Sequence, residues 1–208
     1  MTLLIIILTA IVSIPAFNRH EWFSKLQFNP YQVYHRKEVH RLLTHGFLHA
    51  NWMHLIVNML VLYFFGPYAE QYIRMNLGGL HQWYRLVYLL FYCAGIVVAS
   101  LVTLYKHRNN VWYNAVGASG AVSAVIFLYI FFNPWERIYF YGILPVPGII
   151  MGVLYLLYSH YMSKRGTDQV NHDAHLVGAL FGFVFPLFMD VSLIRGFIER
   201  LLSFRSDR

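Results

Sequence analysis

A serine flanked by glycines is the first residue whose type and surroundings suggest chemistry. Ser119 stands in GASGAVSAV, between Gly117 and Gly120, where a helix is expected to start. Glycines let a substrate carbonyl come close, and the free N–H groups of a helix start point at developing negative charge. Ser119 could therefore be a nucleophile whose own backbone N–H stabilises an oxyanion. Close packing of helices through small residues is the alternative explanation of the same pattern.

A histidine at the start of a later apolar segment could supply the base. His175 begins HLVGALFG, in which Gly178 and Gly182 fall on the same helix face. These glycines would let the helix press against a neighbour and bring the histidine to Ser119. There the imidazole can take the hydroxyl proton and give it to a leaving amine. Because Asp173 faces another side of a helix, we predict a dyad and not a triad.

Two more polar side chains share one face of an apolar segment. His54 and Asn58 are four residues apart, which places them one helical turn from each other. Polar groups are costly in lipid, so each needs a reason. Two hydrogen-bond donors on a neighbouring helix could stabilise the oxyanion of a tetrahedral intermediate. Hydrogen bonding between helices is the alternative, and it requires the same face to turn inward.

The number of histidines also raises the question of a metal site. The candidates are His40, His45, His49, His54, His172 and His175. The sequence has no HExxH pair, and few carboxylates lie near these histidines to complete a ligand set. We therefore expect no metal and no cofactor.

The amino-acid composition indicates whether these residues lie in a soluble or a membrane protein. The chain of 208 residues is 58% hydrophobic and only 12% charged, whereas a soluble domain has about 25% charged residues. This composition predicts a helical membrane protein. The net charge of +7 lies in connections and in the tail, where lipid head groups explain it more simply than nucleic acid. Cys93 is the single cysteine, so an intrachain disulfide is excluded.

Apolar segments predict six membrane helices in one domain, residues 1–190. Their expected ranges are 1–17, 52–68, 86–105, 116–133, 147–162 and 174–189. Pro134 ends the fourth, and Pro147 is expected in the first turn of the fifth. A cleaved signal peptide is the alternative for the first range, although the basic flank of such a signal is missing.

Two further segments lie outside these helices. Residues 18–50 form a connection too long and too aromatic for a plain loop, so we expect it to have its own structure at the membrane interface. Residues 191–208 read as a basic amphipathic tail. Its arginines are Arg195, Arg200, Arg205 and Arg208.

Taken together, these motifs resemble the rhomboid family of intramembrane serine proteases. GASGAVSAV is similar to the family's GxSG, AHLVGALFG to its AHxxGxxxG, and HANWMHLIVN to its HxxxxHxxxN, all in the family's order. The resemblance implies an all-α polytopic fold, with six transmembrane helices in one compact bundle and a long structured first loop. It implies Ser119 as the nucleophile and His175 as the base. His54, Asn58 and the Ser119 N–H would form the oxyanion hole, with His49 ahead of the second span.

The chain departs from the family's pattern in three places. Gly66 and Glu70 resemble its GxxxE, but the glycine expected four residues later is delayed. Where some members have Trp-Arg in the first loop, this chain has His40-Arg41. Ser123 stands where some members carry an aromatic that packs on the catalytic histidine. None of these changes removes a reacting group.

The resemblance implies an endopeptidase that cuts membrane-anchored proteins in or near a transmembrane segment through an acyl-enzyme. Its cavity would open to the non-cytoplasmic side, its partners would be transmembrane substrates and the lipid bilayer, and we expect it in a bacterial cytoplasmic membrane. Two alternatives stay open. A silent relative would bind transmembrane helices without cutting them, and a small transporter with proton-relaying histidines would show flux without hydrolysis.

Overall fold

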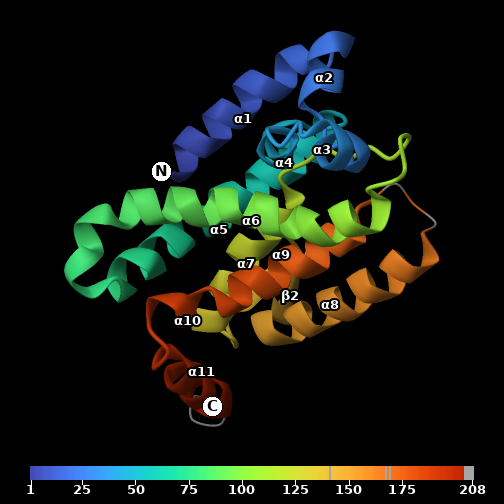
Figure 1. Ribbon diagram of the computed structural model, residues 1–208. Coiled ribbons are helices and arrows are strands. Elements are labelled where there is room, and N and C mark those ends of the chain that lie inside the picture. The colour runs from blue at the N-terminus through green and yellow to red at the C-terminus, as the bar shows by residue number, and fades with distance from the viewer. Residues whose placement is uncertain (141, 167, 169, 204–208) are drawn as a thin grey trace.

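The computed structural model describes residues 1–140, 142–166, 168 and 170–203. Helices make up most of this part of the chain, and they form one compact bundle (Figure 1). The helical elements are α1 Thr2–Ala16, α2 His20–Leu26, α3 Pro30–Arg36, α4 Arg41–Thr44, η1 His45–Phe47, α5 Trp52–Asn76, η2 Gly78–Trp83, α6 Tyr84–His107, α7 Ser119–Phe132, α8 Gly148–Arg165, α9 His172–Val184, α10 Pro186–Met189 and α11 Leu193–Leu202. The strands are β1 Arg137–Phe140 and β2 Leu144–Pro147.

Helix α7 lies in the middle of the bundle. All of its residues except Ser119 and Ile126 are buried. Helices α5, α6, α8 and α9 pack against it, and α9 makes the most extensive contact. A helix that is apolar on every side belongs inside a protein core, which matches the sequence SGAVSAVIFLYIFF. Its 14 residues give it a length of about 21 Å. That is shorter than a hydrocarbon core, but protein surrounds it.

Three helical stretches are long and apolar enough to cross a membrane. They are Trp52–Asn76, Gly78–His107 and His172–Met189. By this measure the described residues contain three spans, where the sequence predicted six. The outer faces of the helices expose large apolar side chains, for example Ile56 on α5 and Leu157 on α8. Lipid acyl chains accept such a surface and water does not, so the structure supports an integral membrane protein.

Two of the differences between the helix bounds and the predicted ranges involve prolines. Helix α5 continues through Pro67 to Asn76, beyond the expected end at residue 68. The proline removes one hydrogen bond, but Ala69 and Ile73 are fully buried, and this packing holds the continuation in place. Pro147 is the N-cap of α8, not a residue of its first turn.

The connection before α8 contains an antiparallel hairpin that the sequence analysis did not predict. Ile138 of β1 pairs with Val146 of β2, and the Ile138 side chain is buried. Prolines are tolerated here because a two-stranded sheet has only edge strands, whose outer N–H groups need no partner strand. Pro145 and Pro147 made the sequence of β2 look unlike a strand.

The long first connection is built from α2, α3, α4 and η1, and Arg41 holds it together. The buried guanidinium donates to the Glu38 carboxylate at 2.6 Å and to the carbonyls of Ser24 and Gln27 at 2.7 and 2.8 Å. Arg41 therefore anchors the loop with His40 beside it in place of a tryptophan. Its bonds to two carbonyls at the C-terminal end of α2 tie that helix to the start of α4.

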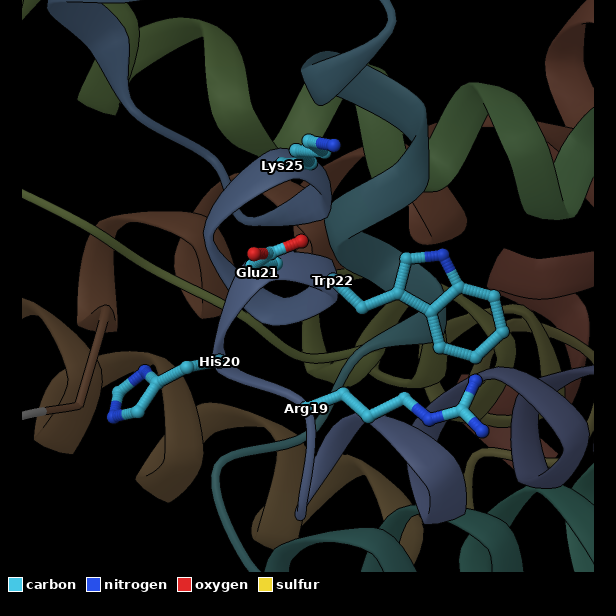
Figure 2. Close-up of a pocket in the computed structure, with 5 residues that line it drawn as sticks. All are labelled: Arg19, His20, Glu21, Trp22 and Lys25. Atoms are coloured by element: carbon cyan, nitrogen blue, oxygen red, sulfur yellow. The ribbon is translucent and has the colours of Figure 1, made fainter.

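A shallow recess marks the outer surface of this connection. Figure 2 shows its lining, Arg19, His20, Glu21, Trp22 and Lys25. The Arg19 guanidinium lies 5.5 Å from the centroid of the Trp22 ring. Exposed tryptophan among basic groups is typical of the boundary between lipid and water. None of the predicted site residues lines this recess.

The C-terminal helix packs against the far end of α7. The ring of Phe197 in α11 stacks on Phe131 with centroids 5.1 Å apart. Arg195 is exposed and pairs with Glu199. Arg205 and Arg208 of the predicted tail lie outside the described residues.

Candidate active site

Ser119 and His175 come together although they are far apart in the sequence. The imidazole Nε2 of His175 lies 2.8 Å from Ser119 Oγ, at hydrogen-bond distance. Ser119 is the first residue of α7, and His175 belongs to the first turn of α9. A hydroxyl that donates to an unprotonated ring nitrogen is the arrangement that a nucleophile and its general base require.

Glycines set the distance between α7 and α9. A Cβ on Gly178 would collide with the carbonyl oxygen of Gly120, and one on Gly182 would collide with that of Ala124. Gly120 itself has no room for a Cβ, because the Cβ of Ala99 in α6 would lie only 2.5 Å away. The backbone of α9 therefore lies directly on α7. The same small residues serve helix packing and the placement of the serine beside the histidine.

Polar anchors fix the start of α9. The Asn171 side chain caps this helix, and its Oδ1 also accepts a hydrogen bond from the Thr103 hydroxyl of α6 at 3.0 Å. The Asp173 carboxylate binds Lys106 Nζ, also of α6, at 2.8 Å. Within the described residues no carboxylate hydrogen-bonds His175. Asp173 thus holds the helix and not the imidazole.

An aromatic ring from α8 lies against the imidazole. The ring centroids of Tyr155 and His175 are 6.1 Å apart, with 22° between the planes. The Tyr155 hydroxyl lies 2.7 Å from Ser123 Oγ. The sequence does not single out this tyrosine, because α8 also carries Tyr158 and Tyr161 and no spacing distinguishes the three.

The predicted oxyanion donors take different positions. The His54 ring lies over Gly117, where a Cβ would be 2.6 Å from His54 Cε1. Gly117 also has φ +127°, a conformation that other residues rarely adopt, so glycine is required there for two reasons. The Asn58 amide donates to the His54 carbonyl at 2.8 Å. One of its two N–H groups is therefore used within α5, and the other is left for a further acceptor.

His49 connects the first loop to the segment that carries the serine. Its side chain is fully buried, with Nδ1 3.0 Å from Ser13 Oγ of α1. Its Nε2 accepts a hydrogen bond from the Ala118 N–H at 3.5 Å, and its ring meets that of His54 edge-on. Close by, the Gly117 N–H donates to the His45 carbonyl at 3.0 Å. The structure thus gathers His49, His54 and Gly117 next to Ser119.

The candidate metal ligands do not converge. Across residues 1–140, 142–166, 168 and 170–203, no three His, Cys, Asp or Glu side chains form a group that could hold a metal ion. His40 Nε2 faces the Lys25 carbonyl at 3.3 Å, whereas His45 Nε2 faces the Ser100 hydroxyl at 3.2 Å. These histidines serve separate hydrogen bonds in the first loop.

Acid is expected to destabilise this loop. Burial lowers the pKa of His45 to about 4, and burial together with the nearby His54 lowers the pKa of His49 to about 3. Because the unfolded chain binds these protons first, stability should fall as the pH drops from about 6.5 to about 4. The loss is about 1.4 kcal/mol per pH unit for each histidine. Unfolding temperatures in detergent, measured from about pH 6.5 to about pH 4, test this loss of stability.

The variant His45→Gln removes one titrating group and keeps a side chain that can hydrogen-bond. Its unfolding temperature should depend less steeply on pH than that of the wild type. The same slope in both proteins would show that His45 is not held neutral in the folded state.

Comparisons with known proteins give the family. A family model described as the Rhomboid domain matches residues 36–190, a range that includes Ser119 and His175. RHOMBOID-like protein 12, mitochondrial, of Arabidopsis thaliana is 30% identical over 156 residues, which cover 68% of this chain and 44% of that relative. Rhomboid-like protein 11, chloroplastic, of the same plant is 31% identical over 158 residues, 70% of this chain and 50% of that relative.

The chain spans about half the length of these curated relatives or slightly less, 50% and 44%. Their names place them in a chloroplast and a mitochondrion, so the comparisons do not support the expected bacterial cytoplasmic membrane. The family match and the apolar helices together indicate an integral membrane protein. The match covers most of the chain and contains the motifs of α5, α7 and α9, and the protein therefore belongs to the rhomboid family.

Proposed function

We propose that this protein is an intramembrane serine endopeptidase that cuts membrane-anchored proteins in or near a transmembrane segment. The distance of 2.8 Å between His175 Nε2 and Ser119 Oγ is the observation that supports it most directly. Rhomboids are generally intramembrane serine proteases, and the names of the two relatives state only that they are rhomboid-like.

The reaction follows from the two side chains. His175 Nε2 takes the proton of Ser119 Oγ as the oxygen bonds to the substrate carbonyl carbon. The protonated imidazole then gives that proton to the amine nitrogen as the C–N bond breaks, which leaves an acyl-enzyme. Water loses a proton to His175, attacks the ester, and releases the acid while the proton returns to Ser119. Each half of the reaction thus uses the same proton carrier.

Negative charge on the substrate oxygen needs donors during both steps. The backbone N–H of Ser119 and the ring of His54 are the proposed donors. Asn58 would add its second amide N–H, since the first is bonded to the His54 carbonyl. Gly117 lets the His54 ring approach the segment before α7, and this proximity supports the assignment.

The proposed setting is a six-span bundle within residues 1–190, built from α1, α5, α6, α7, α8 and α9. Helix α7 can be short because its neighbours cover it, and α8 exposes Val153 and Leu157 as a lipid-facing helix would. In this proposal transmembrane proteins are the substrates, the site opens to the non-cytoplasmic side, and the tail over residues 191–208 lies at the membrane interface. Nucleic acid has no role.

A fluorophosphonate probe tests the proposal without a known substrate. Purified wild-type protein in detergent should be labelled and should cleave a single-span substrate, whereas Ser119→Ala should do neither while still folding. Ser159→Ala is the matched control, because the hydroxyl of this buried serine of α8 has no hydrogen-bond partner in the described structure. It should keep both activities.

The other outcomes identify the alternatives. Equal labelling of wild type and Ser119→Ala would exclude Ser119 as the nucleophile. Folded wild type that binds a transmembrane helix without labelling or cleavage would be a silent relative. Transport of a solute into vesicles without hydrolysis would indicate a transporter.

The oxyanion donors should have unequal effects on turnover. His54→Ala should lower kcat by about 10²-fold, the usual cost of losing one oxyanion donor. Asn58→Ala should cost less, because its amide already serves the His54 carbonyl. Initial rates and unfolding temperatures of both variants are measured together. Full turnover by both variants in folded form would place the oxyanion hole on backbone N–H groups alone.

A further inference from the structure

The His175 ring needs a second support beyond its hydrogen bond to Ser119. A single bond through Nε2 leaves the imidazole free to turn about the axis of that bond. In serine proteases with a triad, a carboxylate on the other ring nitrogen fixes the imidazole. Here Asp173 is bound to Lys106 at 2.8 Å and to Ser163 at 2.6 Å, and so it does not serve that purpose.

Two aromatic contacts constrain the plane of the imidazole instead. Tyr155 lies nearly parallel to the imidazole, with planes 22° apart and centroids separated by 6.1 Å. His172 meets the same ring nearly edge-on, at 80° and 5.8 Å. From these contacts we infer that Tyr155 of α8 is a positioning residue that keeps His175 Nε2 directed at Ser119 Oγ, and that Ser123 holds Tyr155 in place. The inference rests on the proposed function and brings helix α8 into the site.

Tyr155 is itself fixed by helix α7. Its hydroxyl lies 2.7 Å from the buried Ser123 Oγ, and its ring is 5.8 Å from that of Phe127. Ser119, Ser123 and Phe127 are spaced by four residues and therefore share one face of α7. The face that presents the nucleophile thus also places the ring that orients its base. The serine and the imidazole are positioned relative to the same short helix.

Gly152, one turn before Tyr155, allows α8 to approach α7 closely. A Cβ on Gly152 would lie 3.3 Å from Ile130 and 3.4 Å from Phe127, a tight fit. Gly152 precedes Tyr155 by three residues, so the two lie on neighbouring parts of one helix face. This packing brings the tyrosine within reach of Ser123.

Four variants of the full chain separate the ring from its hydroxyl. Tyr155→Leu removes the stacked ring and should lower kcat by about 10- to 100-fold with little change in KM, because small errors in the orientation of a reacting group are costly. Tyr155→Phe and Ser123→Ala keep the ring and lose one hydrogen bond, so each should lower kcat by less than about tenfold. The pair combined should be no worse than either one, since both remove the same bond. Tyr161→Leu is the control, an exposed tyrosine on the same helix.

A second measurement does not depend on cleavage. The stacked Tyr155 ring should shift the ring-proton resonances of His175 upfield in histidine-labelled protein, with His175→Gln used for assignment. Tyr155→Leu should abolish this shift, whereas Tyr155→Phe and Tyr161→Leu should keep it.

The results decide between the possibilities. Wild-type kcat in folded Tyr155→Leu, or a lower unfolding temperature with unchanged kcat per folded molecule, would overturn the positioning role. Unchanged His175 resonances in Tyr155→Leu would overturn the contact itself. A wild-type protein that neither labels nor cleaves overturns the proposed function, and the His175 resonances then still decide whether Tyr155 holds the ring.

Discussion

Replacing His175 by alanine should lower the rate of substrate cleavage by at least about 10³-fold, and adding Ser119→Ala should cost almost nothing more. Without the imidazole, the Ser119 hydroxyl keeps its proton and is a poor nucleophile. Without the serine, the imidazole has nothing to activate. The two side chains share one hydrogen bond at 2.8 Å and should act as a unit.

Initial rates of the two single variants and the double variant form the test. His160→Ala is the control, since this histidine is exposed on α8 and should leave the rate unchanged. Losses that multiply in the double variant would mean that Ser119 and His175 work independently. Near-normal cleavage by His175→Ala would end the assignment of a general base.

Gly178→Ala should lower the stability of this protein strongly, because the added methyl group has no space. Its Cβ would collide with the Gly120 carbonyl oxygen, and both atoms belong to helix backbones that cannot rotate away. Overpacking usually costs about 1–3 kcal/mol, and we expect the upper end of this range or more. The separation of α9 from α7 should also pull His175 away from Ser119, so cleavage should be lost together with stability.

Unfolding temperature and cleavage rate in the same detergent measure this prediction. Gly79→Ala is the matched control, because nothing lies within 4 Å of a Cβ there and its backbone is unstrained. If Gly178→Ala unfolded at the same temperature as Gly79→Ala, the close contact of α7 and α9 would not exist in the folded protein.

The sequence allowed the central pair to be predicted because its signals are local. Gly117 and Gly120 mark the serine, and the spacing of Gly178 and Gly182 after His175 shows which helix face can lie against a neighbour. The apolar segments indicated where helices occur and which residues lie at their starts. These inferences depend on residue type and on the 3.6-residue period of a helix.

What escaped prediction depends on contacts between distant segments. Tyr155 approaches His175 only because Gly152 brings α8 against α7, and its ring looks no different in sequence from other tyrosines on that helix. Helix α5 passes Pro67 because buried residues beyond it outweigh a local breaker. Tertiary packing decides each of these cases.

The protein sheath around α7 has an effect on where a substrate would be cut. Because neighbouring helices and not lipid surround α7, its depth follows the protein body and does not adjust to the thickness of the bilayer. A single-span substrate has no such sheath, and it tilts or shifts to match the local lipid. In the proposed reaction, thickening the bilayer would slide the substrate past a fixed Ser119 by about one residue for every 1.5 Å of vertical shift. The residue at which the substrate is cut would then depend on the length of the lipid acyl chains.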